Sequence, residues 1–217
     1  MTRVVLFGGT GMVGQGCLRE ILLDSGITNV LAIGRRSIGK EDPKLRDVVI
    51  GNLSDLSAVA TELKSVDACL YCLGTSAAGM KEAEYTAVTK TLTLNVLDAL
   101  LAENPNMRFL YVSGAGSDAK SSTMWARVKG ETENEILARA PNTAAIFRPG
   151  LIEPLHGIKG QQSLLYKLMY AATPLLRGLG APVTSTETLG RAMVAVAKGA
   201  STPKKILEND DINNLVR

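Results

Sequence analysis

The amino-acid sequence predicts an α/β fold, in which a doubly wound parallel sheet carries a small C-terminal lobe. Three observations lead to this prediction. Short apolar runs alternate with longer amphipathic runs, as in a chain of β-α units. The apolar runs are rich in Val, Ile and Leu, which is typical of strands covered on both faces. A glycine-rich turn directly follows the first apolar run.

Strands and helices are expected to alternate along most of the chain. The expected strands are Arg3–Phe7, Val30–Gly34, Asp47–Ile50, Asp67–Leu73, Arg108–Ser113 and Ala144–Arg148. The expected helices are Met12–Leu23, Asp55–Lys64, Ala83–Glu103, Thr123–Ala140 and Glu187–Lys198. Ser54 is expected to cap the second helix, and Thr184 with Glu187 to form a capping box for the last. The pattern predicts the strand order 3-2-1-4-5-6, with Lys204–Leu207 as a candidate seventh strand.

Length and composition limit the classes of function. The 217 residues predict one domain over residues 1–217, with residues 151–217 forming the substrate lobe of that domain. A net charge of +3 is too small for a nucleic-acid-binding face. A single His argues against a metal site, so no metal is expected. The remaining expectation is a small-molecule substrate, with a homodimer or a protein partner left open.

The sequence indicates a cytoplasmic protein, because it shows neither a secretory signal nor eighteen consecutive apolar residues. The longest apolar segment, Leu164–Leu179, is interrupted by Lys167, Pro174 and Arg177. Its first part, Leu164–Tyr170, is interpreted as a lid helix packed on the domain rather than as a membrane-binding segment.

Cys69 and Cys72 form a C-x-x-C sequence within a predicted buried strand. Positions three apart on a strand point to opposite faces, so these thiols are not expected to chelate one metal. We expect both to be small core residues.

The glycine turn predicts a site for a dinucleotide. Gly8 permits the tight turn, Gly11 lets the backbone approach a pyrophosphate, and Gly14 lets the helix pack closely on the strand. The helix N-terminus that follows offers N–H groups to phosphates. The turn residues expected to bind are Gly8, Thr10, Gly11, Met12, Val13 and Gly14.

The end of the second predicted strand indicates which dinucleotide is bound. A carboxylate near this position commonly binds the ribose 2′-hydroxyl of NAD. Here the chain has Arg35, Arg36 and Ser37 instead. A guanidinium can bind a 2′-phosphate through two parallel hydrogen bonds, so we expect NADP(H) rather than NAD(H).

Further motifs follow the glycine turn in a fixed order. They are Asn52-Leu53, Leu73-Gly74-Thr75, Ser113 at the end of a strand, Lys129 in Val128-Lys129-Gly130, and Arg148-Pro149-Gly150. In this order they resemble the short-chain dehydrogenase/reductase superfamily, and within it the atypical, NAD(P)-binding branch related to nucleotide-sugar epimerases. The serine and lysine segments resemble the small subgroup that includes the Tat-interacting oxidoreductase-like protein.

The resemblance implies a Rossmann-like fold and a role for each motif. It implies that Asn52 and Leu53 contact the adenine, and that Leu73, Gly74 and Thr75 run beside a cofactor ribose. It implies that Ser113 is the active-site serine and that Lys129 binds the nicotinamide ribose. Pro149, Gly150, Leu151 and Ile152 would then lie near the nicotinamide.

The chain departs from the family at the catalytic tyrosine. That tyrosine would lie four residues before Lys129, where this chain has Trp125. An indole does not ionise in the range in which a phenol can transfer a proton. His156, which follows the Arg-Pro-Gly turn, is a candidate proton donor, with a purely structural loop histidine as the alternative.

Three functions therefore remain open. The first is an NADP(H)-dependent oxidoreductase acting on an unknown small carbonyl or alcohol. The second is a non-catalytic NADP(H)-binding sensor that contacts other proteins, and the third is an epimerase or isomerase.

Overall fold

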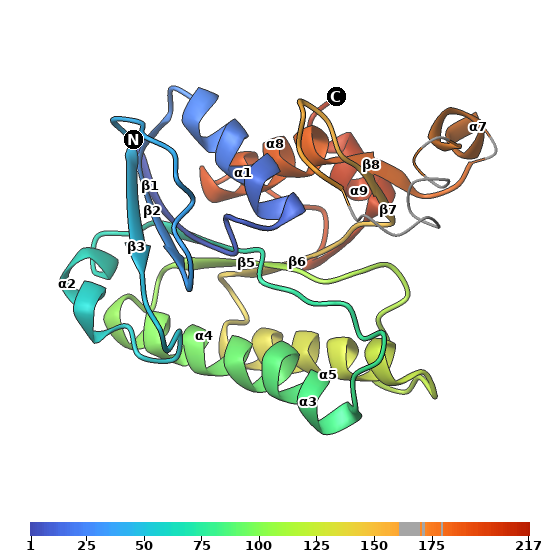
Figure 1. Ribbon diagram of the computed structural model, residues 1–217, viewed down its shortest axis with the longest axis horizontal. Helices are drawn as coiled ribbons and strands as arrows, with labels where there is room; N and C mark the ends of the chain where they lie inside the picture. Colours follow the sequence, from blue (N-terminus) through green and yellow to red (C-terminus); the bar gives the residue numbers. More distant parts are fainter. Residues whose placement is uncertain (161–169, 171, 179) are drawn as a thin grey trace.

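The computed structural model describes residues 1–160, 170, 172–178 and 180–217. A seven-stranded parallel sheet forms its centre, in the order β3-β2-β1-β4-β5-β6-β9 (Figure 1). This confirms the predicted Rossmann-like fold and its strand order. The candidate seventh strand is β9 (Ile206–Glu208), which pairs in parallel with β6 (Ala144–Arg148).

The other strands of this sheet are β1 (Thr2–Phe7), β2 (Ile27–Gly34), β3 (Leu45–Val49), β4 (Ala68–Tyr71) and β5 (Arg108–Val112). A separate two-stranded parallel sheet contains β7 (Leu151–Glu153) and β8 (Val183–Ser185). The helices are α1 (Met12–Leu23), α2 (Ala60–Leu63), α3 (Glu82–Thr86), α4 (Leu92–Glu103), α5 (Met124–Arg139), α7 (Thr173–Gly178), α8 (Thr186–Ala197) and α9 (Asn209–Asn214).

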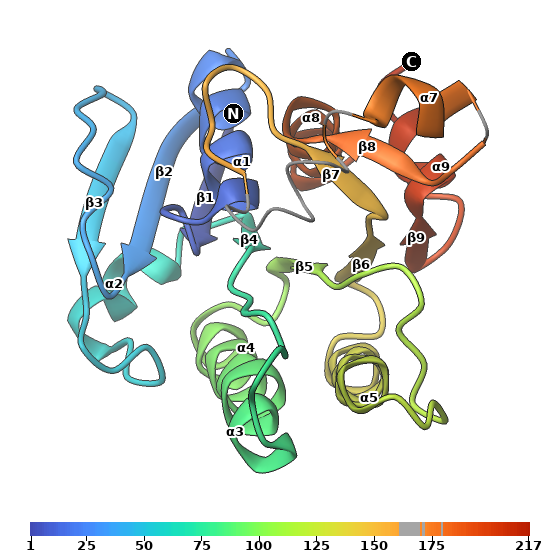
Figure 2. The ribbon, with the colours of Figure 1, turned by 45° about the vertical axis from the view of Figure 1, so that its right-hand side comes forward.

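The sheet separates two hydrophobic cores. Alternate residues of each strand point to opposite faces, so Val5 and Phe7 of β1 pack on one side and Val4 and Leu6 on the other. The first core is closed by α2, α4 and α5, and the second by α1, α8 and α9. Figure 2 shows these two helical layers on either side of the sheet.

The helix expected over Asp55–Lys64 is shorter than predicted. It consists of a 3₁₀ turn over Ser57–Val59 followed by α2. Ser54 does not cap it, because the Asp55 carboxylate accepts the hydrogen bond from the Ser57 N–H at 3.1 Å. An Asx turn therefore begins the segment two residues later than expected.

The helix expected over Ala83–Glu103 is one helical run of three parts. A π-helical stretch, Ala87–Thr91, connects α3 to α4. Thr93 next to this stretch is buried, and its hydroxyl donates to the Thr89 carbonyl at 2.6 Å. Such π turns cost hydrogen-bond geometry and are frequent near functional sites.

The prediction that Thr184 caps the last long helix is wrong. Ser185 caps α8 by accepting a hydrogen bond from the Thr188 N–H at 3.0 Å. Thr184 points the other way, because neighbouring residues of β8 face opposite sides. Its hydroxyl is buried and has no hydrogen-bond partner in the described residues.

The chain after β6 contributes to both sheets. β7 and β8 form the small sheet, whereas α8 packs on α1 and β9 extends the main sheet. The predicted lid helix Leu164–Tyr170 lies outside the described residues except for Tyr170. Among the helices that the structure describes, none combines the length and apolar character needed to cross a membrane.

Candidate functional site

The turn between β1 and α1 is built so tightly that only glycine fits at two positions. Gly8 has a φ of 82°, and a Cβ atom there would lie 2.7 Å from the Cys72 carbonyl carbon. A Cβ atom on Gly14 would lie 2.0 Å from the Gly8 carbonyl oxygen. The helix therefore packs directly on the turn, as the glycine spacing predicts.

The N-terminus of α1 offers free backbone donors. Gly11 is the N-cap residue and supplies no side-chain hydrogen bond, and no residue of the helix's first turn is acidic. The Gly11 N–H itself donates to the Gly8 carbonyl at 2.9 Å, which closes the turn. The helix start at Met12 combines N–H groups that have no partner among the described residues with the positive end of a twelve-residue helix dipole, an arrangement that favours an anion.

A pocket lies beside this turn, at the carboxyl ends of β1 and β2. Its lining residues are Gly8, Gly9, Thr10, Ala32, Ile33, Gly34, Arg35, Arg36, Ile38, Asp47, Leu53 and Leu73. The pocket thus brings together the glycine turn and the end of β2. From the later motifs, Leu53 and Leu73 also line it.

Two arginines at the pocket are available to a ligand. Arg35 and Arg36 are both exposed, and neither guanidinium has an ion pair or hydrogen bond within the described part of the chain. Unpaired guanidinium groups beside a helix N-terminus make the pocket electropositive, which suits a phosphorylated ligand.

Asp47 is a pocket residue that sequence reasoning missed. Its carboxylate accepts hydrogen bonds from the Ser37 hydroxyl and the Ile38 N–H, both at 2.7 Å. These bonds fold the loop after β2 back, so that Ile38 covers Gly9. The pairing of the two strands places this side chain there, because Asp47 of β3 lies opposite Ala32 of β2, next to the loop.

The Asn52-Leu53 segment divides between two roles. Leu53 is buried and lines the pocket. The Asn52 carboxamide instead accepts a hydrogen bond from the Ser54 N–H at 3.1 Å and shapes its own turn. Of the segment after β4, Leu73 lines the pocket, and Gly74 and Thr75 continue from it as exposed residues.

Aromatic rings connect the glycine turn to Lys129. The ring centroids of Phe7 and Tyr71 are 5.7 Å apart, and those of Tyr71 and Tyr111 are 6.0 Å apart. The Lys129 Nζ atom lies 5.7 Å from the centroid of Tyr111. The carboxyl ends of β1, β4 and β5 therefore form one continuous edge that ends at this amine.

Burial changes the chemistry of Lys129. Desolvation lowers the pKa of its ammonium from 10.5 to about 8, although the nearby Glu133 opposes the shift. The amine has no hydrogen-bond or ion-pair partner among the described residues. A partly buried amine of this kind has donors to offer a ligand hydroxyl.

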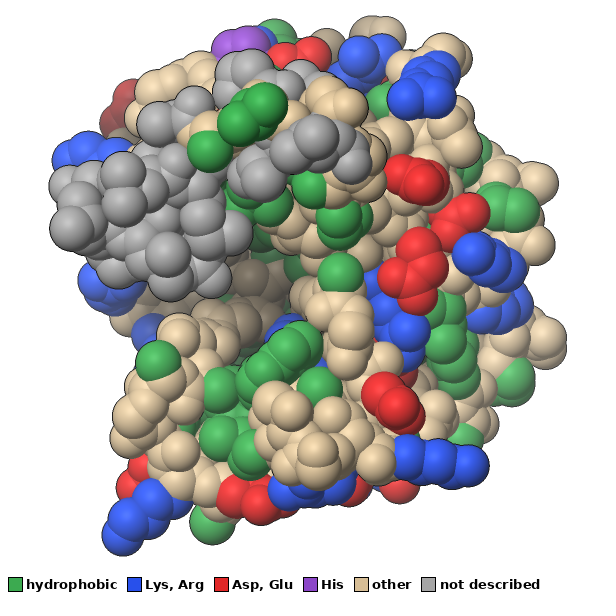
Figure 3. Space-filling view, turned by 90° about the vertical axis from the view of Figure 1, so that its right-hand side faces the viewer, with side chains coloured by type: hydrophobic (Ala, Val, Ile, Leu, Met, Phe, Trp, Pro, Cys, Tyr) green, Lys and Arg blue, Asp and Glu red, His purple; other side chains and the backbone are tan. Residues whose placement is uncertain are grey.

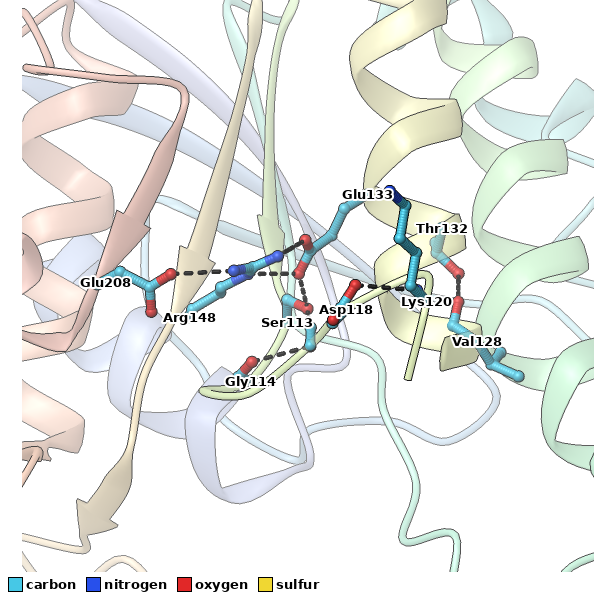
Figure 4. A network of polar contacts seen from close by, with 10 residues as sticks. Ser113, Gly114, Asp118, Lys120, Val128, Thr132, Glu133, Arg148 and Glu208 are labelled. Atoms are coloured by element: carbon cyan, nitrogen blue, oxygen red, sulfur yellow. Dashed lines mark hydrogen bonds and ion pairs between the residues drawn. The ribbon is translucent and has the colours of Figure 1, made fainter. Parts of the chain in front are cut away.

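Ser113 belongs to a buried polar network (Figure 4). Its hydroxyl donates to the Glu133 carboxylate and lies 3.0 Å from the Ser117 hydroxyl. Glu133 is 1% exposed, and Arg148 Nε binds its two carboxylate oxygens at 3.0 and 3.1 Å. Arg148 also binds Glu208 at 3.0 Å. The network thus joins β5, α5, β6 and β9.

Trp125 lies one helical turn before Lys129 on α5. Its indole is partly buried, and the Cβ position of Gly116 lies 3.7 Å from the ring. Directly after Ser113, a Cβ atom on Gly114 would meet no atom within 4 Å. The loop after β5 is therefore open at Gly114 and faces the indole near Gly116.

The Arg-Pro-Gly turn is anchored on both sides. The Pro149 carbonyl accepts a bond from the Ala115 N–H at 2.9 Å, and the Gly150 N–H donates to Asn209 at 3.1 Å. Leu151 and Ile152 then start β7 and are partly buried. The turn is fixed against the loop after β5, so these residues border the same strand end as Ser113.

His156 follows β7 in a left-handed conformation, with a φ of 56°. Its Nε2 atom bonds with the Glu187 carboxylate at the start of α8, and this bond lowers the pKa of Glu187. The histidine is thus paired with the N-terminal turn of α8.

Figure 3 shows the face of the molecule that lies on the right of Figure 1. This face is hollowed near its middle, and hydrophobic side chains gather at the hollow. Among the described residues, no group of three or more His, Cys, Asp and Glu side chains is arranged to hold a metal ion.

Comparison with known proteins decides the family. Residues 4–136 match the model of the NAD dependent epimerase/dehydratase family. The chain belongs to this family. A nicotinamide dinucleotide is therefore the class of cofactor that the family membership supports, and the glycine-turn geometry agrees with it.

Individual relatives agree with the family assignment. The protein fmp52, mitochondrial, of Emericella nidulans is 31% identical over 160 residues, which are 70% of this chain and 67% of the relative. Protein HTATIP2 of Rattus norvegicus is 28% identical over 69% of this chain and 62% of its own length. The fold is shared with Gre2 from Candida albicans, whose structure in complex with NADPH has a TM-score of 0.73 at 11% identity, covering 95% of this chain and 77% of Gre2.

The cytoplasmic location expected from the sequence is contradicted by these relatives. Several fmp52 proteins that match this epimerase/dehydratase family member are named mitochondrial. The expectation was wrong because it rested on the lack of a secretory signal and of a long apolar span. Neither feature distinguishes a cytoplasmic protein from a mitochondrial one.

Proposed function

We propose that this epimerase/dehydratase family member binds NADP(H) across the Gly8–Gly14 turn, without a serine–tyrosine pair to transfer protons. Its function is then that of a dinucleotide-binding protein that responds to NADP(H), either alone or with a protein partner. The observation that carries the proposal is the bond from the Ser113 hydroxyl to the buried Glu133 carboxylate.

The choice of NADP(H) rests on charge. Arg35 and Arg36 line the pocket and have no partner among the described residues. In NAD sites a carboxylate commonly holds the ribose 2′-hydroxyl. Asp47 lines this pocket, but its carboxylate is already bonded to Ser37 and Ile38. The two guanidinium groups are thus left to bind the 2′-phosphate.

The proposal that this protein does not transfer protons to a substrate rests on two positions. Ser113 is 7% exposed and its hydroxyl is engaged by Glu133, so it is unsuited to orienting a substrate carbonyl. Trp125 replaces the tyrosine, and an indole N–H does not ionise in the physiological range. An epimerase or isomerase that removes a proton from a hydroxyl needs the same pair, so the geometry disfavours that function too.

The remaining motif residues bind and orient the dinucleotide in this proposal. Lys129, whose amine has no hydrogen-bond or ion-pair partner in the described part of the chain, donates to the nicotinamide ribose, and the Pro149–Ile152 segment borders the nicotinamide. A bound NADPH would supply a hydride. The chain's own residues hold the cofactor and, through Trp125, cover it with an apolar surface. His156 fixes its loop to α8 through Glu187 rather than moving a proton.

One observation favours a second candidate function, the reduction of a small carbonyl compound. The pKa of Lys129 is lowered to about 8, so its ammonium can donate a proton near neutral pH. In that function Lys129 replaces the tyrosine as the acid. The substrate lobe, residues 151–217, would then select the carbonyl compound.

Turnover separates the two functions. The purified protein is mixed with NADPH and a panel of aldehydes and ketones, and NADPH absorbance is followed over the range from about pH 6 to about pH 9. Our proposal predicts binding without oxidation of NADPH beyond the rate in buffer. Oxidation that depends on both the protein and a carbonyl compound, and that is lost in Lys129→Met at an NADPH concentration that still saturates the variant, would establish the second function instead.

A further inference from the structure

Two cysteines that are far apart in sequence meet directly beneath the glycine turn. The Sγ atoms of Cys17 on α1 and Cys72 after β4 are 3.7 Å apart. Cys17 is fully buried, whereas Cys72 is partly exposed. Cys69 belongs to the opposite core, as its spacing from Cys72 predicts, and serves as an internal reference thiol.

We propose that Cys17 and Cys72 form a disulfide on oxidation, and that this disulfide weakens dinucleotide binding. The first part stands on the thiol geometry alone. The second part rests on the proposed function, since it concerns the same NADP(H) site.

The reaction needs an oxidant of the hydroperoxide class. The sulfur of Cys72, which is the less buried residue of the two, attacks the peroxide, so that its S–H bond is replaced by an S–OH bond and water leaves. The Cys17 sulfur then attacks the Cys72 sulfur, the S–S bond forms, and the hydroxyl leaves as a second water. Two thiols thus lose two electrons and two protons, and one hydrogen peroxide becomes two waters.

The effect on binding follows from the position of Cys72. Its backbone already touches Gly8, because a Cβ atom on Gly8 would lie 2.7 Å from the Cys72 carbonyl carbon and oxygen. A disulfide requires the sulfur atoms to approach to about 2 Å. The turn has no space to absorb this movement, so either α1 or the segment that begins with Leu73 must shift. Leu73 lines the pocket, and α1 begins at Met12, two residues after Thr10 of the glycine turn that lines it.

The rate of oxidation has a defined pH dependence. The hydrogen bond to Cys17 and burial raise the pKa of Cys72 above its ordinary value. The thiolate is the reactive form, so oxidation is expected to accelerate as the pH rises from about 7 to about 9.

The test treats the reduced, folded protein with hydrogen peroxide, blocks the remaining thiols after unfolding, and maps the peptides. We expect a Cys17–Cys72 cross-link, a mass loss of about 2 Da and alkylation of Cys69 alone. Cys69→Ala should still form the cross-link, and Cys72→Ala should not. Oxidation of Cys72 to a sulfinic acid with no cross-link in wild type would overturn the first part.

NADPH affinity is then measured on the reduced, the oxidised and the re-reduced protein. We expect the oxidised form to bind about tenfold more weakly, with recovery after reduction by dithiothreitol. Equal affinity of the reduced and oxidised forms would overturn the second part. Failure of the reduced protein to bind NADPH would instead contradict the proposed function, while the cross-link result would still decide the first part.

Discussion

The Ser113 hydroxyl donates its hydrogen bond to the Glu133 carboxylate, one helical turn beyond Lys129 on α5. This bond places the residue that resembles a catalytic serine inside a structural network. Arg148 neutralises the same carboxylate, so the network is a buried ion pair with a hydroxyl attached. The side chains of this network thereby fix the carboxyl end of β5, beside which the nicotinamide is proposed to lie. They are Ser113, Ser117, Glu133, Arg148 and Glu208.

Ser113→Ala should reduce stability and leave NADPH affinity unchanged. The substitution removes one hydrogen bond to a charged group, which costs about 1–3 kcal/mol of unfolding free energy. Glu133→Ala should cost more, up to about 3–5 kcal/mol, because it removes the buried carboxylate that binds both Ser113 and Arg148 and leaves Arg148 with the half-exposed Glu208 as its remaining carboxylate partner. Urea unfolding and calorimetric titration measure the two quantities. The exposed Ser201→Ala is the control, and a large loss of NADPH affinity in Ser113→Ala would show that its hydroxyl contacts the ligand.

Arg35→Ala and Arg36→Ala should each weaken NADPH binding and leave NADH binding nearly unchanged. Loss of one charge-assisted phosphate contact costs about 1.5–3 kcal/mol, or about tenfold to a hundredfold in affinity. Lys40→Ala is a matched control, since Lys40 is an exposed cation of the same loop that does not line the pocket. An equal loss of affinity for NADPH and for NADH would mean that the arginines do not bind the 2′-phosphate.

Gly14→Ala should abolish measurable NADPH binding, because the new Cβ atom would lie 2.0 Å from the Gly8 carbonyl oxygen. The helix must then move away from the turn, which carries the proposed pyrophosphate site. Gly51→Ala is the control, as Gly51 is exposed and a Cβ atom there meets nothing within 4 Å. Thermal unfolding separates lost binding from lost folding. Wild-type affinity in Gly14→Ala would exclude the turn as the binding site.

Lys129→Met should weaken NADPH binding but stabilise the protein without ligand. The folded-state pKa of Lys129, about 8, lies below the ordinary value of 10.5, so the folded state holds its proton less tightly than the unfolded chain. Wild-type stability should therefore rise between about pH 8 and about pH 10.5, by up to about 3 kcal/mol. The substitution should remove this rise. Urea unfolding across the pH range measures it.

Lys90→Met is the control for the lysine experiment, because Lys90 is ion-paired with Glu131 on the neighbouring part of the same helical layer. The rise in stability that we assign to Lys129 should persist in this variant. A rise in stability that persists in Lys129→Met would assign the titration to another group.

The sheet could be predicted from the sequence because the apolar runs and the glycine turn correspond directly to strands and to the β1–α1 connection in the structure. The apolar strands lie in both cores and the glycine turn joins β1 to α1, so periodicity alone specifies their places. Helix starts were less predictable. Asp55 and Ser185 each made the capping bond that the sequence pattern assigned to a neighbouring residue.

The site was predicted only where a motif is contiguous. Gly8, Arg35 and Leu73, each from a contiguous motif, line one pocket, and their contact with a cofactor stays a prediction. The role of Asp47 depends on a loop ten residues away folding back onto it, and the engagement of Ser113 depends on Glu133 twenty residues later. No local pattern contains such contacts.

The central claim is that NADPH binds along the strand edge from Gly8 to Lys129. Trp125 tests it most directly, because it is the chain's single tryptophan and lies one turn before Lys129. In a titration with NADPH, our account predicts saturable quenching of tryptophan emission, sensitised NADPH emission and one site per chain. NADH should give the same signal only at higher concentration. Tryptophan emission that stays unchanged while calorimetry shows NADPH binding would place the cofactor elsewhere and contradict the account.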